Sequence, residues 1–225
     1  MSVSALPEAL LFDLDGTLLD TAPDFYRVIN QQLREAQRDE RSYEFVRARV
    51  SHGASALVCG AFDITPEHAE HDVRRARLLE LYLAEVCVDT SLFAGLESSL
   101  NWARQRKIPW GIITNKPRLY SEALMAALPD LADCAVLVCP DDVTHRKPHP
   151  EPMYLACAQL NVSPDKCVYV GDHQRDIDAG KAAGMMTVAA AYGYVDEDSA
   201  AETWGADVCI ASGAELVDWL KRSYE

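Results

Sequence analysis

The sequence lacks a long hydrophobic run, an excess of positive charge and a paired-cysteine motif. No apolar stretch approaches the roughly 20 residues that a membrane-spanning helix requires. The 21 Lys and Arg residues are outnumbered by 35 Asp and Glu residues, and the net charge of −14 disfavours binding to nucleic acid or to an anionic membrane. The 7 cysteines are scattered without a Cys-x-x-Cys pair, which is typical of buried thiols in a reducing compartment.

Two further absences concern a targeting segment and the common nucleotide-binding and serine-hydrolase motifs. Residues 1–8 lack the basic segment and apolar stretch of a signal peptide. The sequence also contains no Gly-x-Gly-x-x-Gly motif, Walker loop or Gly-x-Ser-x-Gly motif. We therefore expect a cytoplasmic protein that binds neither nucleic acid nor membrane, and the sequence leaves open whether it is a monomer or a homodimer.

Short apolar runs alternate with helical patterns along most of the chain, in which 49% of the residues are hydrophobic. This βαβα order predicts an α/β protein with a parallel sheet covered by helices on both faces. The expected strands are 9–13, 108–114, 135–138, 167–171, 187–190 and 207–210. The expected core helices are 96–106, 118–128, 152–160, 176–183 and 214–221.

The segment 21–88 interrupts this alternation with several helical patterns and no strand. Pro23 suits a helix start, a second helix is expected to open at Thr65-Pro66, and a loop is expected at 51–53. We predict an α-helical cap domain, 21–88, inserted into a core domain formed by 1–20 and 89–225. The apolar residues that recur at helical spacing and are expected in the core of the cap are Phe25, Val28, Ile29, Leu33, Val73, Leu78, Leu81 and Val86.

Two aspartates follow the first expected strand in the string Asp13-Leu14-Asp15-Gly16-Thr17. Side chains two positions apart in an extended chain point the same way. Carboxylates held so close repel each other, and one is pushed toward its protonated form unless a cation intervenes. The pair therefore indicates a metal site, acid–base chemistry or both, whereas a lone Asp-x-Asp would fit an acidic turn.

Three more polar segments lie where ligands bind in open α/β sheets, near the carboxyl ends of strands. Thr114 and Asn115 begin a turn whose hydroxyl and backbone N–H groups can hold phosphate oxygens. Lys147 lies in a proline-rich loop and offers a point charge for phosphate. Asp172 and Asp176 form Gly-Asp-x-x-x-Asp after an apolar run, and such oxygen ligands suit Mg²⁺.

Each of these segments also has a purely structural interpretation. Thr114 fits a helix cap, Lys147 or its neighbour Arg146 fits an exposed basic loop, and Asp176 fits the N-cap region of the next helix. Taken singly, they would not identify a site, and it is their shared position that favours function.

The histidines do not form a transition-metal site by their spacing. His68 and His71 are three positions apart on a charged helix and are expected on a solvated face. His145 and His149 flank Lys147 in a loop and are expected to be exposed, and the role of His173 stays open.

Together, the four segments resemble the four motifs of the haloacid dehalogenase (HAD) superfamily, in the same order and with a helical insert after the first motif. The resemblance covers nearly the whole chain and implies a Rossmann-like HAD core with a small cap. It implies that Asp13 attacks phosphorus and that Asp15 is the general acid and base. Thr114 and Asn115 would bind substrate. Lys147 would neutralise the transferring phosphoryl group, with Arg146 as the alternative that the Lys-Pro match favours less.

The resemblance also implies a cofactor and a substrate class. Mg²⁺ would be held by Asp13, Asp172 and the backbone carbonyl of Asp15, with Asp176 as a supporting or water-mediated partner. The segments 114–117, 138–141, 192–194 and 204–207 look most like the phosphoglycolate phosphatase branch, including its bacterial relatives that act on N-acetylmuramic acid 6-phosphate. The implied reaction is hydrolysis of a small organic phosphate through an aspartyl-phosphate.

Substrate choice is expected to involve the cap. His52, with Gly53 and the nearby Arg49, lies in a polar loop of an otherwise helical segment, and we predict that His52 contacts substrate. Three alternatives remain open: a phosphosugar mutase of the same superfamily, a receiver-like phospho-acceptor module, and a noncatalytic binder of phosphometabolites. Asp15 argues against a haloacid dehalogenase, because that position is not Asp in those enzymes.

Overall fold

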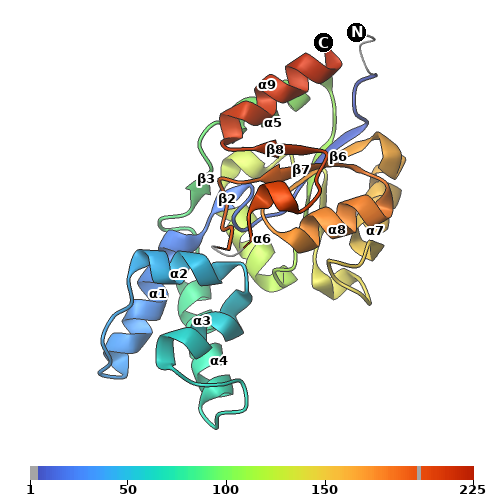
Figure 1. Ribbon diagram of the computed structural model, residues 1–225. Coiled ribbons are helices and arrows are strands. Elements are labelled where there is room, and N and C mark those ends of the chain that lie inside the picture. The colour runs from blue at the N-terminus through green and yellow to red at the C-terminus, as the bar shows by residue number, and fades with distance from the viewer. Residues whose placement is uncertain (1–4, 197–198) are drawn as a thin grey trace.

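A parallel six-stranded sheet forms the centre of the computed structural model, which describes residues 5–196 and 199–225 (Figure 1). Residues 1–4, part of the segment that argued against a signal peptide, lie outside the described residues. The predicted α/β class with a parallel sheet is confirmed. In sheet order the strands are β5 (Val136–Val138), β4 (Trp110–Ile113), β1 (Ala9–Phe12), β6 (Cys167–Gly171), β7 (Met186–Ala190) and β8 (Val208–Ile210).

Alternate residues of the buried strands point to opposite faces, and each face packs against its own helices. Leu10 and Phe12 of β1 join one hydrophobic cluster, and Ala9 and Leu11 join another. The first cluster is covered by α5 (Leu96–Arg106), α6 (Arg118–Ala126) and α9 (Gly213–Tyr224). The second is covered by α7 (Glu151–Leu160) and α8 (Gln174–Ala183).

The segment between β1 and β4 contributes a separate group of helices that lies beside the sheet in Figure 1. These helices are α1 (Ala22–Glu35), α2 (Tyr43–Val50), α3 (Gly53–Phe62) and α4 (His71–Ala84). They share their own hydrophobic cluster, which includes Phe25, Val28, Ile29 and Leu33 as predicted. A two-stranded antiparallel ribbon, β2 (Leu19–Asp20) with β3 (Ser91–Leu92), joins the start and the end of this helical insert.

Part of the sequence prediction for the insert is wrong. Thr65-Pro66 does not open a helix, because the chain forms turns there and α4 begins at His71. Val73 is 72% exposed, since the buried stripe of α4 runs through positions 71, 78, 81 and 82 and position 73 lies outside it. His71, expected on a solvated face, is buried and its Nε2 lies 2.8 Å from the Ser55 hydroxyl.

Element bounds elsewhere differ from the predicted ones by at most three residues. The remaining short elements are the 3-10 helices Pro129–Leu131, Pro140–Asp142, Pro164–Lys166 and Ala201–Thr203. Within the described residues, every helix is too short or too polar to cross a bilayer.

The packing of α5 on the sheet gives a stability prediction. Leu100 of α5 is fully buried in the first cluster, whereas Leu119 of α6 is 58% exposed. Leu100→Ala should lower the free energy of unfolding by about 2–5 kcal/mol, because it leaves a cavity. Leu119→Ala should change it by less than about 0.5 kcal/mol. Urea unfolding measures both, and equal effects would contradict the burial of α5.

Candidate active site

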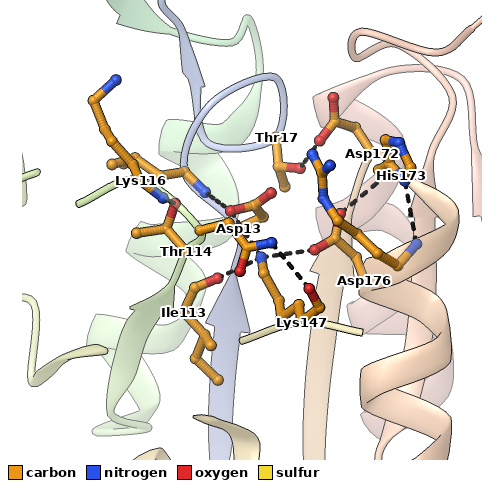
Figure 2. A network of polar contacts seen from close by, with 12 residues as sticks. Asp13, Thr17, Ile113, Thr114, Lys116, Lys147, Asp172, His173 and Asp176 are labelled. Atoms are coloured by element: carbon orange, nitrogen blue, oxygen red, sulfur yellow. Dashed lines mark hydrogen bonds and ion pairs between the residues drawn. The ribbon is translucent and has the colours of Figure 1, made fainter. Parts of the chain in front are cut away.

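The polar residues predicted from four separate segments lie together at the carboxyl edge of the sheet (Figure 2). Asp13 directly follows β1, Thr114 follows β4 and Asp172 follows β6. Lys147 reaches the same place from the loop before α7. Because neighbouring parallel strands end at one edge, residues far apart in the sequence face one another there.

Lys147 is buried rather than exposed and is surrounded by oxygen atoms. Its Nζ lies 2.9 Å from Asp13 Oδ1 and 2.7 Å from Asp176 Oδ1. It also donates hydrogen bonds of 2.8 Å to the Ile113 carbonyl and to the Tyr169 hydroxyl. The lysine therefore holds two carboxylates and the end of β4 at one point.

Three buried carboxylates gather around this single ammonium group. Oxygens of Asp13, Asp172 and Asp176 all lie within 4.8 Å of one another. Burial raises the pKa of Asp13, although Lys147 opposes that shift. Burial, followed by repulsion from Asp13 and Asp176, raises the pKa of Asp172 to about 7. Three carboxylates against one ammonium leave negative charge uncompensated, so this set of hard oxygen donors fits a divalent cation.

Asp172 is fixed by backbone and hydroxyl donors. Its Oδ1 accepts a 2.9 Å hydrogen bond from the Thr17 hydroxyl, and its Oδ2 accepts a 2.8 Å hydrogen bond from the Tyr194 N–H. Gly16 has φ +84°, and a Cβ there would lie 2.1 Å from Asp172 Oδ2. The turn after Asp15 therefore requires glycine both for its conformation and for the close approach of Asp172.

Asp15 is held by a lysine and by a hydroxyl at the start of the helical insert. Its Oδ1 accepts hydrogen bonds from the Lys116 ammonium at 2.9 Å and from the Thr21 hydroxyl at 2.6 Å. The Lys116 Nζ lies 5.0 Å from the ring centre of Phe25 and 4.6 Å from that of Tyr82. Burial opposes the charged form of Lys116, but attraction to Asp15 and Tyr82 outweighs it and raises the pKa.

Lys116 is a residue that sequence reasoning missed as a site residue. The available signal was its place in the same turn as Thr114, whose Oγ1 accepts a hydrogen bond of 3.1 Å from the Lys116 N–H. Asn115, predicted to bind substrate, donates through Nδ2 to the Lys147 carbonyl at 3.1 Å, and its Oδ1 is buried without a partner among the described residues. Asn115 thus supports the Lys147 loop as well as lining the cavity.

A cavity of about 540 Å³ separates the sheet edge from the helical insert. His52 lines this cavity, and its Nε2 also lies 2.8 Å from Asp196 Oδ1. The His52 ring meets that of His173 edge-on, with 5.9 Å between centroids. From the sheet side the cavity is lined by Asp13, Asp15, Thr114, Asn115, Lys116, Pro117, Tyr120, Arg146, Lys147, Pro148 and Arg175.

His173 and Asp176 begin α8 with a reciprocal cap. His173 Nδ1 accepts a 3.2 Å hydrogen bond from the Arg175 N–H, and Asp176 Oδ2 accepts a 3.1 Å hydrogen bond from the His173 N–H. Burial, then repulsion from Arg175, lowers the pKa of His173 to about 4. The neutral ring can therefore accept the capping bond, and Asp176 combines capping with its contact to Lys147.

Other candidates lie outside the cavity. The guanidinium of Arg49 stacks 3.7 Å from the ring centre of Phe45 and does not line the cavity. His145 and His149 are exposed, as predicted, and their rings face each other beside Glu151.

The chain is similar to a known family of hydrolases and to named phosphatases. The family model for haloacid dehalogenase-like hydrolases matches residues 7–184. An N-acetylmuramic acid 6-phosphate phosphatase from Pseudomonas putida is 40% identical over 92% of this chain and 93% of its own length. A phosphoglycolate phosphatase from Xanthomonas campestris pv. campestris is 39% identical over 93% of this chain and 95% of its own length.

The fold is also found in solved structures. The crystal structure of a predicted phosphoglycolate phosphatase from Haemophilus somnus superposes with a TM-score of 0.82. It covers 94% of this chain and 97% of its own, at 24% sequence identity.

The burial of Lys147 gives a stability prediction with an exposed control. Lys147→Met should lower the free energy of unfolding by about 3–5 kcal/mol, because Asp13 and Asp176 would stay buried without their cation. Lys166→Met removes an exposed pair with Glu8 and should change the free energy of unfolding far less, because solvent screens that pair. Urea unfolding in EDTA compares the two, and similar losses would show that the Lys147 contacts contribute little.

The raised pKa of Asp172 predicts how its stability contribution depends on pH without bound metal. Between the ordinary value of 3.8 and the folded value of about 7, the folded protein keeps a proton that the unfolded chain has released. Stability from this group is therefore lost as the pH rises through that window. Asp172→Asn should gain stability relative to the unsubstituted protein from pH 4 to 7, as measured by unfolding in EDTA. A difference that is independent of pH would refute this assignment.

Proposed function

This chain belongs to the haloacid dehalogenase-like hydrolase family, and from that premise we propose that it is a Mg²⁺-dependent phosphatase of small phosphomonoesters that works through an aspartyl-phosphate. The observation that carries the proposal is that Asp13, Asp15, Thr114 and Lys147 line one cavity, while a carboxylate oxygen of Asp172 lies within 4.8 Å of one from Asp13. If these residues served only to stabilise the fold, one lysine would not need three buried carboxylates near it.

The metal belongs with the acidic cluster. Asp13 and Asp172 would hold it together with the backbone carbonyl of Asp15, and Asp176 would stay bound to Lys147 as a supporting partner. When bound, Mg²⁺ neutralises the repulsion between an anionic nucleophile and an anionic phosphoester. This assignment is supported by the donor chemistry, because Mg²⁺ prefers carboxylate and carbonyl oxygens.

Asp13 is the proposed nucleophile. Its Oδ1 is occupied by the Leu14 N–H at 2.7 Å and by the Lys147 ammonium, which leaves Oδ2 for attack on phosphorus. In the first step a bond forms between Oδ2 and phosphorus while the ester P–O bond breaks, and Asp15 gives its proton to the leaving alkoxide. In the second step Asp15 takes a proton from water while the water oxygen bonds to phosphorus. The bond between Asp13 Oδ2 and phosphorus breaks, which releases inorganic phosphate and restores the carboxylate.

Basic and polar groups around the phosphoryl site have separate tasks. Thr114 and Lys147 would stabilise the equatorial phosphoryl oxygens. Lys116 now pairs with Asp15, and an incoming phosphoryl group offers this ammonium a competing anionic partner. Transfer of Lys116 to the substrate would free Asp15 to carry the proton. Substrate binding would thus be coupled to the loss of the ion pair between Asp15 and Lys116.

The substrate and the domain motion are proposed from the relatives and the insert. The named activities of the relatives suggest 2-phosphoglycolate or a sugar phosphate such as N-acetylmuramic acid 6-phosphate. We propose that 21–88 is a cap on a core of 1–20 and 89–225, and that it closes over the cavity to exclude water. His52 would contact the part of the substrate beyond the phosphate.

Turnover of p-nitrophenyl phosphate tests the nucleophile and the metal. Asp13→Asn should lower kcat at least about a thousandfold, because the nucleophilic carboxylate is lost. EDTA should abolish activity and Mg²⁺ should restore it. Asp218→Asn, at an exposed position of α9, is the matched control and should retain full activity. Full activity in Asp13→Asn would refute the proposed mechanism.

Trapping tests the second step in the same preparation. Asp15→Asn should slow turnover about 10²–10⁴-fold. Acid quenching followed by intact-protein mass spectrometry should reveal one added phosphoryl group on Asp13. Stoichiometric release of phosphate, rather than an isomeric phosphosugar, distinguishes a phosphatase from a mutase.

A further inference from the structure

Three arginines line the cavity. Arg75 comes from α4 of the insert, Arg146 from the loop before α7 and Arg175 from α8. Arg175 donates to the Ser51 carbonyl at 2.7 Å, and its Nε is buried without a partner. Within the described residues, Arg75 and Arg146 have neither an ion-pair partner nor a hydrogen-bond acceptor. The proposed mechanism uses none of the three.

Arg75 differs from the other arginines of its own helix. Arg74 pairs with Glu70 at 2.8 Å, and Arg77 pairs with Glu35 and Glu80, each at 2.8 Å. The chain carries 35 acidic and 21 basic residues, so carboxylates are abundant on its surface. Arg75 is exposed, lines the cavity and lacks such a partner, so its guanidinium is available to a ligand anion.

The guanidinium group matches one kind of ligand especially well. Its planar N–H donors bind a carboxylate through two parallel hydrogen bonds. The two named substrates of the relatives, phosphoglycolate and N-acetylmuramic acid 6-phosphate, both carry one carboxylate besides the phosphoester. Lys147 and Lys116 already occupy the phosphoryl end of the cavity.

We propose that Arg75, assisted by Arg146, forms a subsite for a substrate carboxylate, so that the enzyme selects phosphomonoesters that also carry a carboxylate. This inference rests on the proposed function and names the substrate class of the same cavity. The volume of about 540 Å³ exceeds the needs of a two-carbon phosphate and accommodates a sugar. Val50, Leu79 and Tyr82 would contact the carbon skeleton between the two anions.

The placement of the two arginines adds a consequence for closure. Arg75 belongs to the insert and Arg146 to the α/β part of the chain. A carboxylate bound by both would connect the two parts and favour the closed form. A substrate without the carboxylate would bind its phosphate but make no such connection.

A matched pair of substrates tests the subsite. N-acetylmuramic acid 6-phosphate differs from N-acetylglucosamine 6-phosphate by a lactyl ether that carries the carboxylate. Arg75→Ala should lower kcat/KM for the first compound about 10–100-fold more than for the second, because charge-assisted hydrogen bonds are lost. Arg75→Lys should recover part of the preference. Arg77→Ala, on the same helix but paired with the exposed Glu35 and Glu80, should leave the ratio unchanged.

Binding measurements separate this inference from the proposed function. Calorimetry on Asp13→Asn and on Asp13→Asn with Arg75→Ala, in Mg²⁺, compares affinity for the two sugar phosphates without turnover. A preference for the carboxylate that depends on Arg75 supports the subsite. If the unsubstituted protein hydrolyses neither sugar phosphate, the phosphatase proposal fails while this preference still supports the subsite. Equal affinities, or an equal loss on both ligands in Arg75→Ala, would overturn the subsite.

Discussion

One buried ammonium group faces three buried carboxylates, and the site is arranged around that imbalance. Lys147 contacts Asp13 and Asp176 directly, while Asp172 lies close by with its own donors. Coulomb repulsion in a desolvated pocket is strong, so the cluster favours either a bound proton or a further cation.

The helical insert is attached to the same cluster. Tyr194 donates its backbone N–H to Asp172, and its hydroxyl donates to Asp20 at 2.6 Å and accepts from the Ala22 N–H at 2.8 Å. Its ring joins the hydrophobic cluster of the insert. Arg47 of α2 donates to the Gly193 carbonyl at 2.6 Å. The position of the insert and the position of Asp172 are therefore linked through one loop.

Much of the fold was predictable because its signals are local. Apolar runs of strand length, separated by helical patterns, depend on periodicities of two and 3.6 residues that are visible in any single segment. The errors arose where local signals compete. Thr65-Pro66 has the composition of a helix start, yet the chain forms turns there, and Val73 is apolar but lies outside the buried stripe of α4. Neither outcome follows from the residues themselves.

The sequence alone determined which side chains meet at the sheet edge, because in a parallel sheet a residue that follows a strand must lie at that edge. This rule alone was enough to predict the positions of Asp13, Thr114 and Asp172. Tertiary structure alone decided that Asp15 turns to Lys116, that Asp176 binds Lys147 as well as capping a helix, and that Arg75 faces a cavity without a partner. Such pairings depend on side-chain directions across elements that are distant in the chain, and no local pattern encodes those directions.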